Sequence, residues 1–467
     1  MFSRLIRKEL TNYLLDLRFT IVFALCALLS ALSVYIGGQH YVLQLGEYSE
    51  TMESHRQTLQ AYIDNKKLNY LQVVGERWNR RPEVLSPVVY GLSGKLGREV
   101  LIQYQTLPKF EASLFEEDPI YTIFGVLDLA FVVKIVLSIC VLLFTYDAIC
   151  GEKEGGTLRL FSSFPASRST LALAKLAGAS VAVLVPFLFG VLLAAVVMAL
   201  VPEIDMQHED WARMGALMVV FALYLGVFVA FGLLVSALTH RRMTAFLGLL
   251  GLWAVWIFIV PDLAVNTARY LRPAGSGVDL LKGVDKLLWE IDEKRDEAVG
   301  AYWEKARIED WDALPDARKI AFREGVKRIH NRWDAEFYPR LIRLQEKPRN
   351  LMRQQQRLAM FMSAVSPFGA VTFASMDLAR TGYVQKEWTE DALGHHLIYM
   401  GQYIRNKRVV PLREELDLTD YSRFTYQNKE TLSECLVRNA FHILNLVLLM
   451  LVGFAGAYVA ILRYDVR

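Results

Sequence analysis

The segment LAFVVKIVLSICVLLFTYDAICGEKEGGTLRLFSSFPASR, residues 129–168, carries the strongest fold signal in the chain. Its first part, 129–146, contains a single charged side chain, Lys134. A run of roughly 20 apolar residues is long enough to cross a hydrocarbon core of about 30 Å. The residues that follow are charged and rich in glycine. The segment therefore predicts a membrane-spanning helix that ends in a short polar loop.

Five further apolar runs have comparable length. Any one of them could be a buried helix of a soluble protein, but six in one chain favour a membrane protein. The composition agrees, because 54% of the residues are hydrophobic while 22% are charged. We therefore predict an all-α membrane protein. Its six transmembrane helices are expected at 19–38, 129–147, 169–200, 213–239, 244–261 and 440–463.

The charges of the loops set the expected orientation. The short loop 201–212 has four acidic residues and no Lys or Arg, whereas basic residues flank the opposite ends of the runs. Positive charge concentrates on the cytoplasmic side of membrane proteins. We therefore predict that both termini are cytoplasmic, in the inner (cytoplasmic) membrane of the cell. The expected cytoplasmic segments are 1–18, 148–168, 240–243 and 464–467.

Most of the polar residues then fall in two extracytoplasmic insertions, 39–128 and 262–439. Apolar residues recur at spacings of three and four over 42–63, 280–303 and 320–341, which is the period of one helix face. Neither insertion shows a sustained alternation typical of strands. We expect the two insertions to pack together as one mostly helical extracytoplasmic domain.

The residues before the first apolar run predict an amphipathic helix. Leucine and isoleucine recur there at helical spacing, with charged residues between them. Such a helix lies in the membrane interface with its charged face in water. The charged residues of this interfacial helix are Arg4, Arg7, Lys8 and Glu9.

The loop after the second run predicts a short helix between two turns. Gly155 and Gly156 permit a sharp turn, and Thr157 can cap a helix that Pro165 ends. Ser167 or Ser169 can cap the next helix. A short helix held between two spans is suited to receive force from a soluble partner. A loop with no such role is an equal alternative.

The same loop resembles that of the permeases of ABC-2 type ABC transporters, and more narrowly the multicopper-enzyme-maturation permease group. The resemblance rests on the pattern Glu-Lys-Glu-x-Gly-Thr-Leu, then Pro-x-Ser-Arg and a downstream Lys175. Here the matching residues are Glu152, Lys153, Glu154, Gly155, Gly156, Thr157, Leu158, Pro165, Ser167 and Arg168.

This resemblance implies that the loop is a coupling helix that docks on a separate ABC ATPase subunit. That partner would bind ATP and Mg, and the interfacial helix would help to hold it. Two permease chains, identical or paralogous, would pair in the lipid with substrate moving between them. The large insertions after the first and fifth runs depart from the compact family pattern, so the substrate stays open.

Four polar residues lie in or beside the expected spans. Ionisable groups inside a membrane are functional candidates. A substrate path and simple helix packing are equal alternatives for them. The residues are Lys134, Asn439, His442 and Asn445.

The predicted function is thus a permease subunit of an ATP-driven transporter, with no catalytic residues of its own. The alternative is a non-transporting mechanotransmission subunit, in which the outer helices regulate a protein partner in the cell envelope. The chain lacks a Walker motif, and no ligand spacing predicts a bound metal or cofactor. A net charge of +3 disfavours a nucleic-acid partner.

Overall fold

Among the residues that the structure describes, six helices are long and apolar enough to cross a membrane, judged by length and composition, as the sequence predicts. The computed structural model describes residues 2–65, 68–94, 97–104, 106, 108–111, 127–156, 168–274, 277–407, 417–426, 428 and 430–463. The first long helix is α2 (Leu17–Asp64). The second joins α5 (Leu129–Phe131), the π-helix η1 (Val132–Leu137) and α6 (Ser138–Thr145), and α7 (Cys150–Glu154) follows it. The others are α9 (Arg168–Ala199), α10 (His208–Leu238), α11–η2–α12 (Arg242–Ala254, Val255–Ile259, Val260–Leu271) and α18 (Ala440–Arg463).

Helix α10 lies at the centre of this bundle. It contacts α6, α9, α11, α15 (Pro367–Leu378) and α18. Its aromatic residues Phe221, Tyr224 and Phe228 are buried in the bundle core. Small residues let the helices approach closely, because a Cβ at Gly232 would collide with Thr145. The centre of the bundle is therefore packed side chain against side chain.

The fifth long helix does not end at Pro261, where the sequence analysis ends the span. It continues through α12 to Leu271. Proline lacks the N–H that an interior helical position would use, but Pro261 sits in the first turn of α12, directly after the π-helical turn η2. The proline is thus accommodated where the helix changes type.

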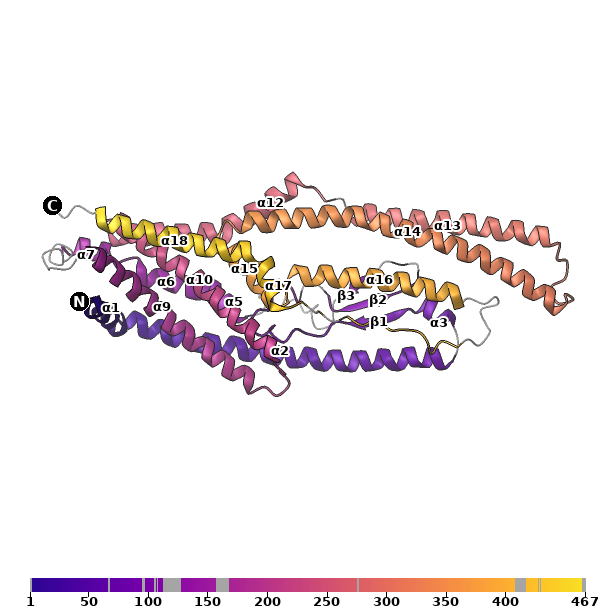
Figure 1. The fold of residues 1–467 in the computed structure, drawn as a ribbon, viewed down its shortest axis with the longest axis horizontal. Coiled ribbons are helices and arrows are strands. Elements are labelled where there is room, and N and C mark those ends of the chain that lie inside the picture. The colour runs from indigo at the N-terminus through magenta and orange to yellow at the C-terminus, as the bar shows by residue number, and fades with distance from the viewer. Residues whose placement is uncertain are drawn as a thin grey trace.

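A second, distal domain extends from one end of the bundle (Figure 1). The outer half of α2 forms one side, and a hairpin of α13 (Gly277–Ala306) and α14 (Asp316–Ser363) extends furthest from the bundle. Between them lie α3 (Leu68–Val73), α16 (Tyr383–Lys407) and a small sheet. Both insertions contribute to one buried core, which includes Trp78, Val100, Ile291, Phe337 and Leu397.

The small sheet corrects the all-α prediction. Strands β1 (Glu76–Asn79), β2 (Glu99–Ile102) and β3 (Lys109–Glu111) form an antiparallel sheet in that order, with Trp78 opposite Val100. Each strand has only three or four residues. In β1, Trp78 and Asn79 are adjacent and both buried, so the alternation that marks a longer strand is absent.

The distal domain is anchored to the bundle by buried polar contacts. Arg213 of α10 is fully buried and donates to Glu209, to the carbonyl of Leu378 at 3.4 Å and to the carbonyl of Glu430 at 2.7 Å. Leu378 ends α15, and Glu430 immediately precedes the cap of α17 (Leu432–Arg438). One guanidinium group therefore joins a long bundle helix to two segments at the base of the distal domain.

Candidate functional site

The amphipathic helix α1 (Phe2–Leu15) packs closely on α9, at the end of the bundle opposite the distal domain (Figure 1). A Cβ at Gly178 would lie 2.9 Å from the Cβ of Glu9, so this approach requires a glycine. Glu9 is 7% exposed, although its place in an amphipathic pattern suggests a surface residue. Arg7 is exposed and Lys8 is half-buried, while the side chain of Arg4 lies outside the described residues.

Lys175 of α9 is the centre of a buried ionic cluster. Its ammonium lies 2.7 Å from a carboxylate oxygen of Glu152 and 3.5 Å from one of Glu9, and it donates to the carbonyl of Ala148 at 3.1 Å. Lys175 is 4% exposed. A buried charge of this kind is tolerated only when it is paired and hydrogen-bonded. The cluster therefore ties α1 and α7 to the same point of α9.

Helix α7 is also fixed to the turn between α10 and α11. Lys153 donates to the carbonyls of Ala237 and Thr239. A carboxylate oxygen of Glu154 accepts from the backbone N–H of Arg242 at 3.0 Å. All three charged residues of α7 thus make contacts within this chain, and their side chains position the helix rather than project freely from it.

A further ion pair closes the same end of the bundle. Arg18 at the start of α2 lies 3.0 Å from Asp147, which follows α6, and its guanidinium also stacks over the ring of Tyr146. The sequence analysis includes Lys175 in the family pattern but assigns no ionic partner to Lys175 or Arg18, because nothing in their local sequence reveals partners on other helices. Together these contacts connect α1, α2, α7, α9 and the α10–α11 turn.

The predicted loop residues divide between described and undescribed parts of the chain. Gly155 ends α7, and Gly156 has a φ of 70°, which suits the sharp turn expected there. Arg168 begins α9, but its side chain is not described. Four further predicted residues lie outside the described residues: Thr157, Leu158, Pro165 and Ser167.

The polar residues of the spans contact other helices. The Nδ2 of Asn439 donates to a carboxylate oxygen of Asp377 at 3.1 Å, and Asn445 donates to the carbonyl of Ala364. The ring of His442 lies 5.8 Å from that of Phe373. All three partners belong to the end of α14 or to α15, so these contacts support the packing alternative.

Lys134 lies in η1, on the second span. Its ammonium is 3.5 Å from the hydroxyl of Thr372 and 5.5 Å from the centre of the Phe368 ring. Both partners belong to α15. Lys134 therefore faces the same helix as the polar residues of α18.

Asn439→Leu is expected to lower the stability of the chain by about 1–3 kcal/mol, because it leaves the buried carboxylate of Asp377 with one donor fewer. The measurement is the thermal unfolding midpoint of the purified chain in detergent. Asn406→Leu, at an exposed position, is the matched control. An unchanged midpoint in Asn439→Leu would contradict the packing role.

The apolar helices define a multi-pass membrane protein whose short charged helix is fixed at one end of the bundle. The chain matches the description "ABC-2 family transporter protein" over residues 4–466, and it therefore belongs to that family of membrane permeases.

Two relatives carry the printed name "Probable ABC transporter permease protein NosY". The chain is 31% identical to the one from Stutzerimonas stutzeri over 154 residues, which is 33% of this chain and 55% of the relative. It is 34% identical to the one from Pseudomonas aeruginosa over 134 residues, which is 28% of this chain and 46% of the relative. The chain thus spans about half the length of these curated relatives.

Proposed function

We propose that this chain is the permease subunit of an ATP-driven ABC-2 type transporter. A separate ABC ATPase subunit binds ATP and Mg, and this chain couples ATP hydrolysis to movement of a substrate across or out of the membrane. Family membership supports the class. The observation that carries the coupling role is the Lys175 cluster, because it joins α1 and α7 into one unit at one end of the bundle.

The proposed orientation places this end of the bundle in the cytoplasm and the distal domain outside, in the inner membrane. The basic residues near α1, α7 and the α10–α11 turn support it. A second permease chain, identical or paralogous, is part of the proposed assembly. In this chain only 22% of the apolar window of α11–α12 and 17% of that of α18 are buried, which leaves large apolar faces for lipid or for that second chain.

Glu152→Ala and Gly156→Pro are expected to reduce ATPase coupling at least tenfold while leaving membrane insertion intact. The first removes the closest partner of Lys175. The second forces a φ near −65° where the chain needs 70°. The measurement is affinity purification in mild detergent with mass spectrometry of the retained proteins, together with ATP hydrolysis. Glu309→Ala, at an exposed position of the distal domain, is the matched control.

Two outcomes would contradict the proposal. The first is that both variants still retain an ATPase during purification and still stimulate its ATP hydrolysis normally. The other is an unaltered chain that retains no ATPase even after gentle crosslinking in the membrane.

The mechanotransmission alternative rests on one observation, that α2 runs without a break from the bundle into the distal domain. Membership of a transporter family favours transport over this alternative. The two differ in their response to a shortened α13–α14 hairpin. A transporter would keep ATPase assembly and lose transport, whereas a regulator would keep assembly and lose control of its envelope partner.

A further inference from the structure

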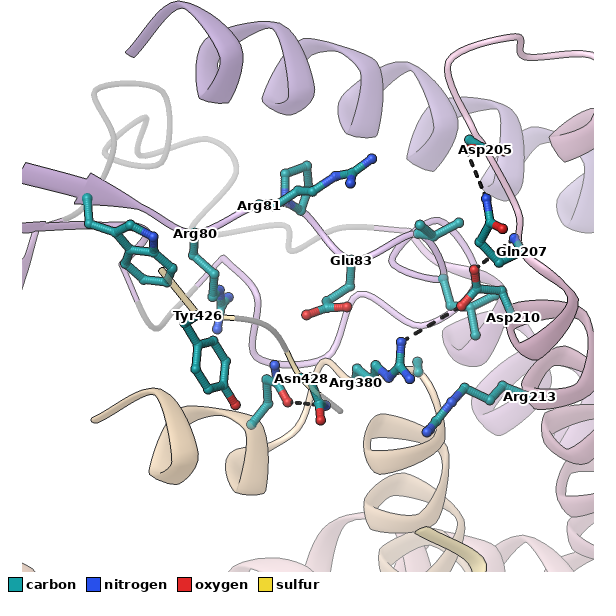
Figure 2. Close-up of a pocket in the computed structure, with 16 residues that line it drawn as sticks. Arg80, Arg81, Glu83, Asp205, Gln207, Asp210, Arg213, Arg380, Tyr426 and Asn428 are labelled. Carbon is teal, nitrogen blue, oxygen red and sulfur yellow. Dashed lines mark hydrogen bonds and ion pairs between the residues drawn. The ribbon is translucent and has the colours of Figure 1, made fainter. Parts of the chain in front are cut away.

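A cavity of about 350 Å³ lies where the distal domain meets the bundle (Figure 2). The described residues that line it are Trp78 of β1, the loop after β1 (80–85), residues around the start of α10 (205–213), the turn between α15 and α16 (379–385), and Tyr426 with Asn428. Ligand sites of small molecules occupy volumes of this order. The cavity lies at the opposite end of α10 from α7, so it is separate from the proposed coupling site.

The lining of this cavity carries both signs of charge. Among the described residues of the lining, four arginines face three carboxylates, those of Glu83, Asp205 and Asp210. Arg213 and Arg380 already hold the carboxylate of Glu209, at 2.9 Å and 3.0 Å. Since the charges nearly balance, the cavity is not simply a site for anions. A ligand that fits it needs a cationic group as well as an anionic one.

Glu83 is the lining residue that most clearly lacks a partner. Its side chain is half-buried and points into the cavity between Arg80 and Arg380 (Figure 2). Within the part of the chain that the structure describes, its carboxylate accepts no hydrogen bond and touches no cationic group, although the nearby charges of Arg80 and Arg380 favour its ionised form. A partly buried carboxylate is costly when it is unpaired. An ammonium group from a ligand would satisfy it.

Arg80 and Arg380 are suited to bind the anionic group of such a ligand. Arg80 is 8% exposed, and its guanidinium points into the same space as the carboxylate of Glu83 (Figure 2). Arg380 approaches from the opposite side, at the end of α15. A phosphate offers enough oxygen acceptors for two guanidinium groups at once. The site also lies at the first turn of α10, one of the candidate membrane spans, and lipid headgroups are expected near the ends of such spans.

We propose that this cavity binds a zwitterion that joins an ammonium group to a phosphate. Glu83 accepts from the ammonium, and Arg80 and Arg380 donate to the phosphate. Both a phospholipid headgroup and a free aminoalkyl phosphate diester have this chemistry. The proposal does not depend on the ATPase-coupling role, because the two sites lie at opposite ends of the bundle.

Proton binding by Glu83 gives the site a pH dependence. The pKa of Glu83 is raised to about 7, mainly by burial and also by the nearby charge of Asp210, while Arg80, Arg380 and Arg213 oppose the rise. Tyr426 also lines the cavity, and burial raises the pKa of its phenol, so it stays neutral in this range. Only ionised Glu83 pairs with an ammonium. Affinity should therefore fall about tenfold from pH 8 to pH 6, as the ionised fraction falls.

The test uses the full chain in mild detergent and glycerophosphoethanolamine, a soluble diester whose phosphate does not titrate in this range. Binding is measured by calorimetry at pH 8 and pH 6. Glu83→Gln is expected to weaken binding at least tenfold at pH 8 and to remove the pH dependence. Arg380→Gln is expected to weaken it by a similar factor, and Glu309→Gln to leave it unchanged.

Fragment ligands and a conservative variant complete the test. Glycerophosphoglycerol, a phosphate diester without an ammonium, and ethanolamine should each bind at least tenfold more weakly than the joined zwitterion, and Glu83→Asp should retain more binding than Glu83→Gln. Equal binding of the diester without an ammonium, or unchanged binding in Glu83→Gln, would overturn the proposal, as would no binding at millimolar probe. The two sources of the ligand are separated by placing the chain in nanodiscs that contain phosphatidylethanolamine. If this lipid prevents binding of the soluble probe, the ligand is a lipid headgroup. If the probe still binds, the ligand is a free diester.

Discussion

Lys175→Met is expected to abolish stimulation of the proposed partner ATPase and to lower the stability of the chain by about 3–5 kcal/mol. The substitution keeps the length of the side chain but removes the ammonium that Glu9 and Glu152 share. Removing one partner of a buried ionic cluster is costly because the remaining charges stay buried and unpaired. ATP hydrolysis of the purified assembly and the thermal unfolding midpoint of the chain measure the two effects.

Two further variants test whether the effect of Lys175→Met comes from the lost charge or from altered packing. Lys175→Met combined with Glu9→Gln and Glu152→Gln should recover much of the lost stability, because no buried carboxylate is then left unpaired. Lys282→Met, at an exposed position of α13, should change neither property. Full coupling and stability in Lys175→Met alone would show that the cluster does not hold α1 and α7 in place.

Arg213→Met is expected to lower the stability of the chain by about 3–5 kcal/mol and to loosen the base of the distal domain. The residue is fully buried and donates to Glu209 and to the carbonyls of Leu378 and Glu430. Each of these acceptors would lose a charged donor. The measurements are the unfolding midpoint and limited proteolysis between α15 and α17.

The conservative variant Arg213→Lys should give an intermediate result, since an ammonium keeps the charge but cannot reproduce the fork of donors. Proteolysis as slow as in the unaltered chain would contradict an anchoring role for Arg213. A uniform loss of membrane insertion in Arg213→Met would instead mean that the residue acts during folding.

The sequence predicts the long elements of this protein well, because long helices give a repeated signal. The six apolar runs and the amphipathic stretches of α2, α13 and α14 are all visible as composition or as a helical period. The sheet could not be predicted from the sequence, because its strands are too short to give a repeated signal. Strands of three or four residues contain too few positions to show an alternation, and Trp78 and Asn79 of β1 break it.

The candidate site is predictable only in part. The pattern around α7 and the charged face of α1 identify two of its pieces, but not the contact between them. Glu9 is expected at the surface because helix periodicity cannot show that Gly178 of another helix makes room for it. Similarly, nothing in the local sequence around Arg213 or Glu83 indicates which distant segments surround them.

The continuous helix α2 has a mechanical consequence. Its 48 residues span about 72 Å, and its first turn is held to Asp147 by Arg18 while its far end belongs to the core of the distal domain. A rigid helix of that length converts a small rotation at one end into a large displacement at the other. A rotation of about 5° at the inner end would displace the outer end by about 6 Å. Small movements near α7 would therefore be amplified at the outer end of α2.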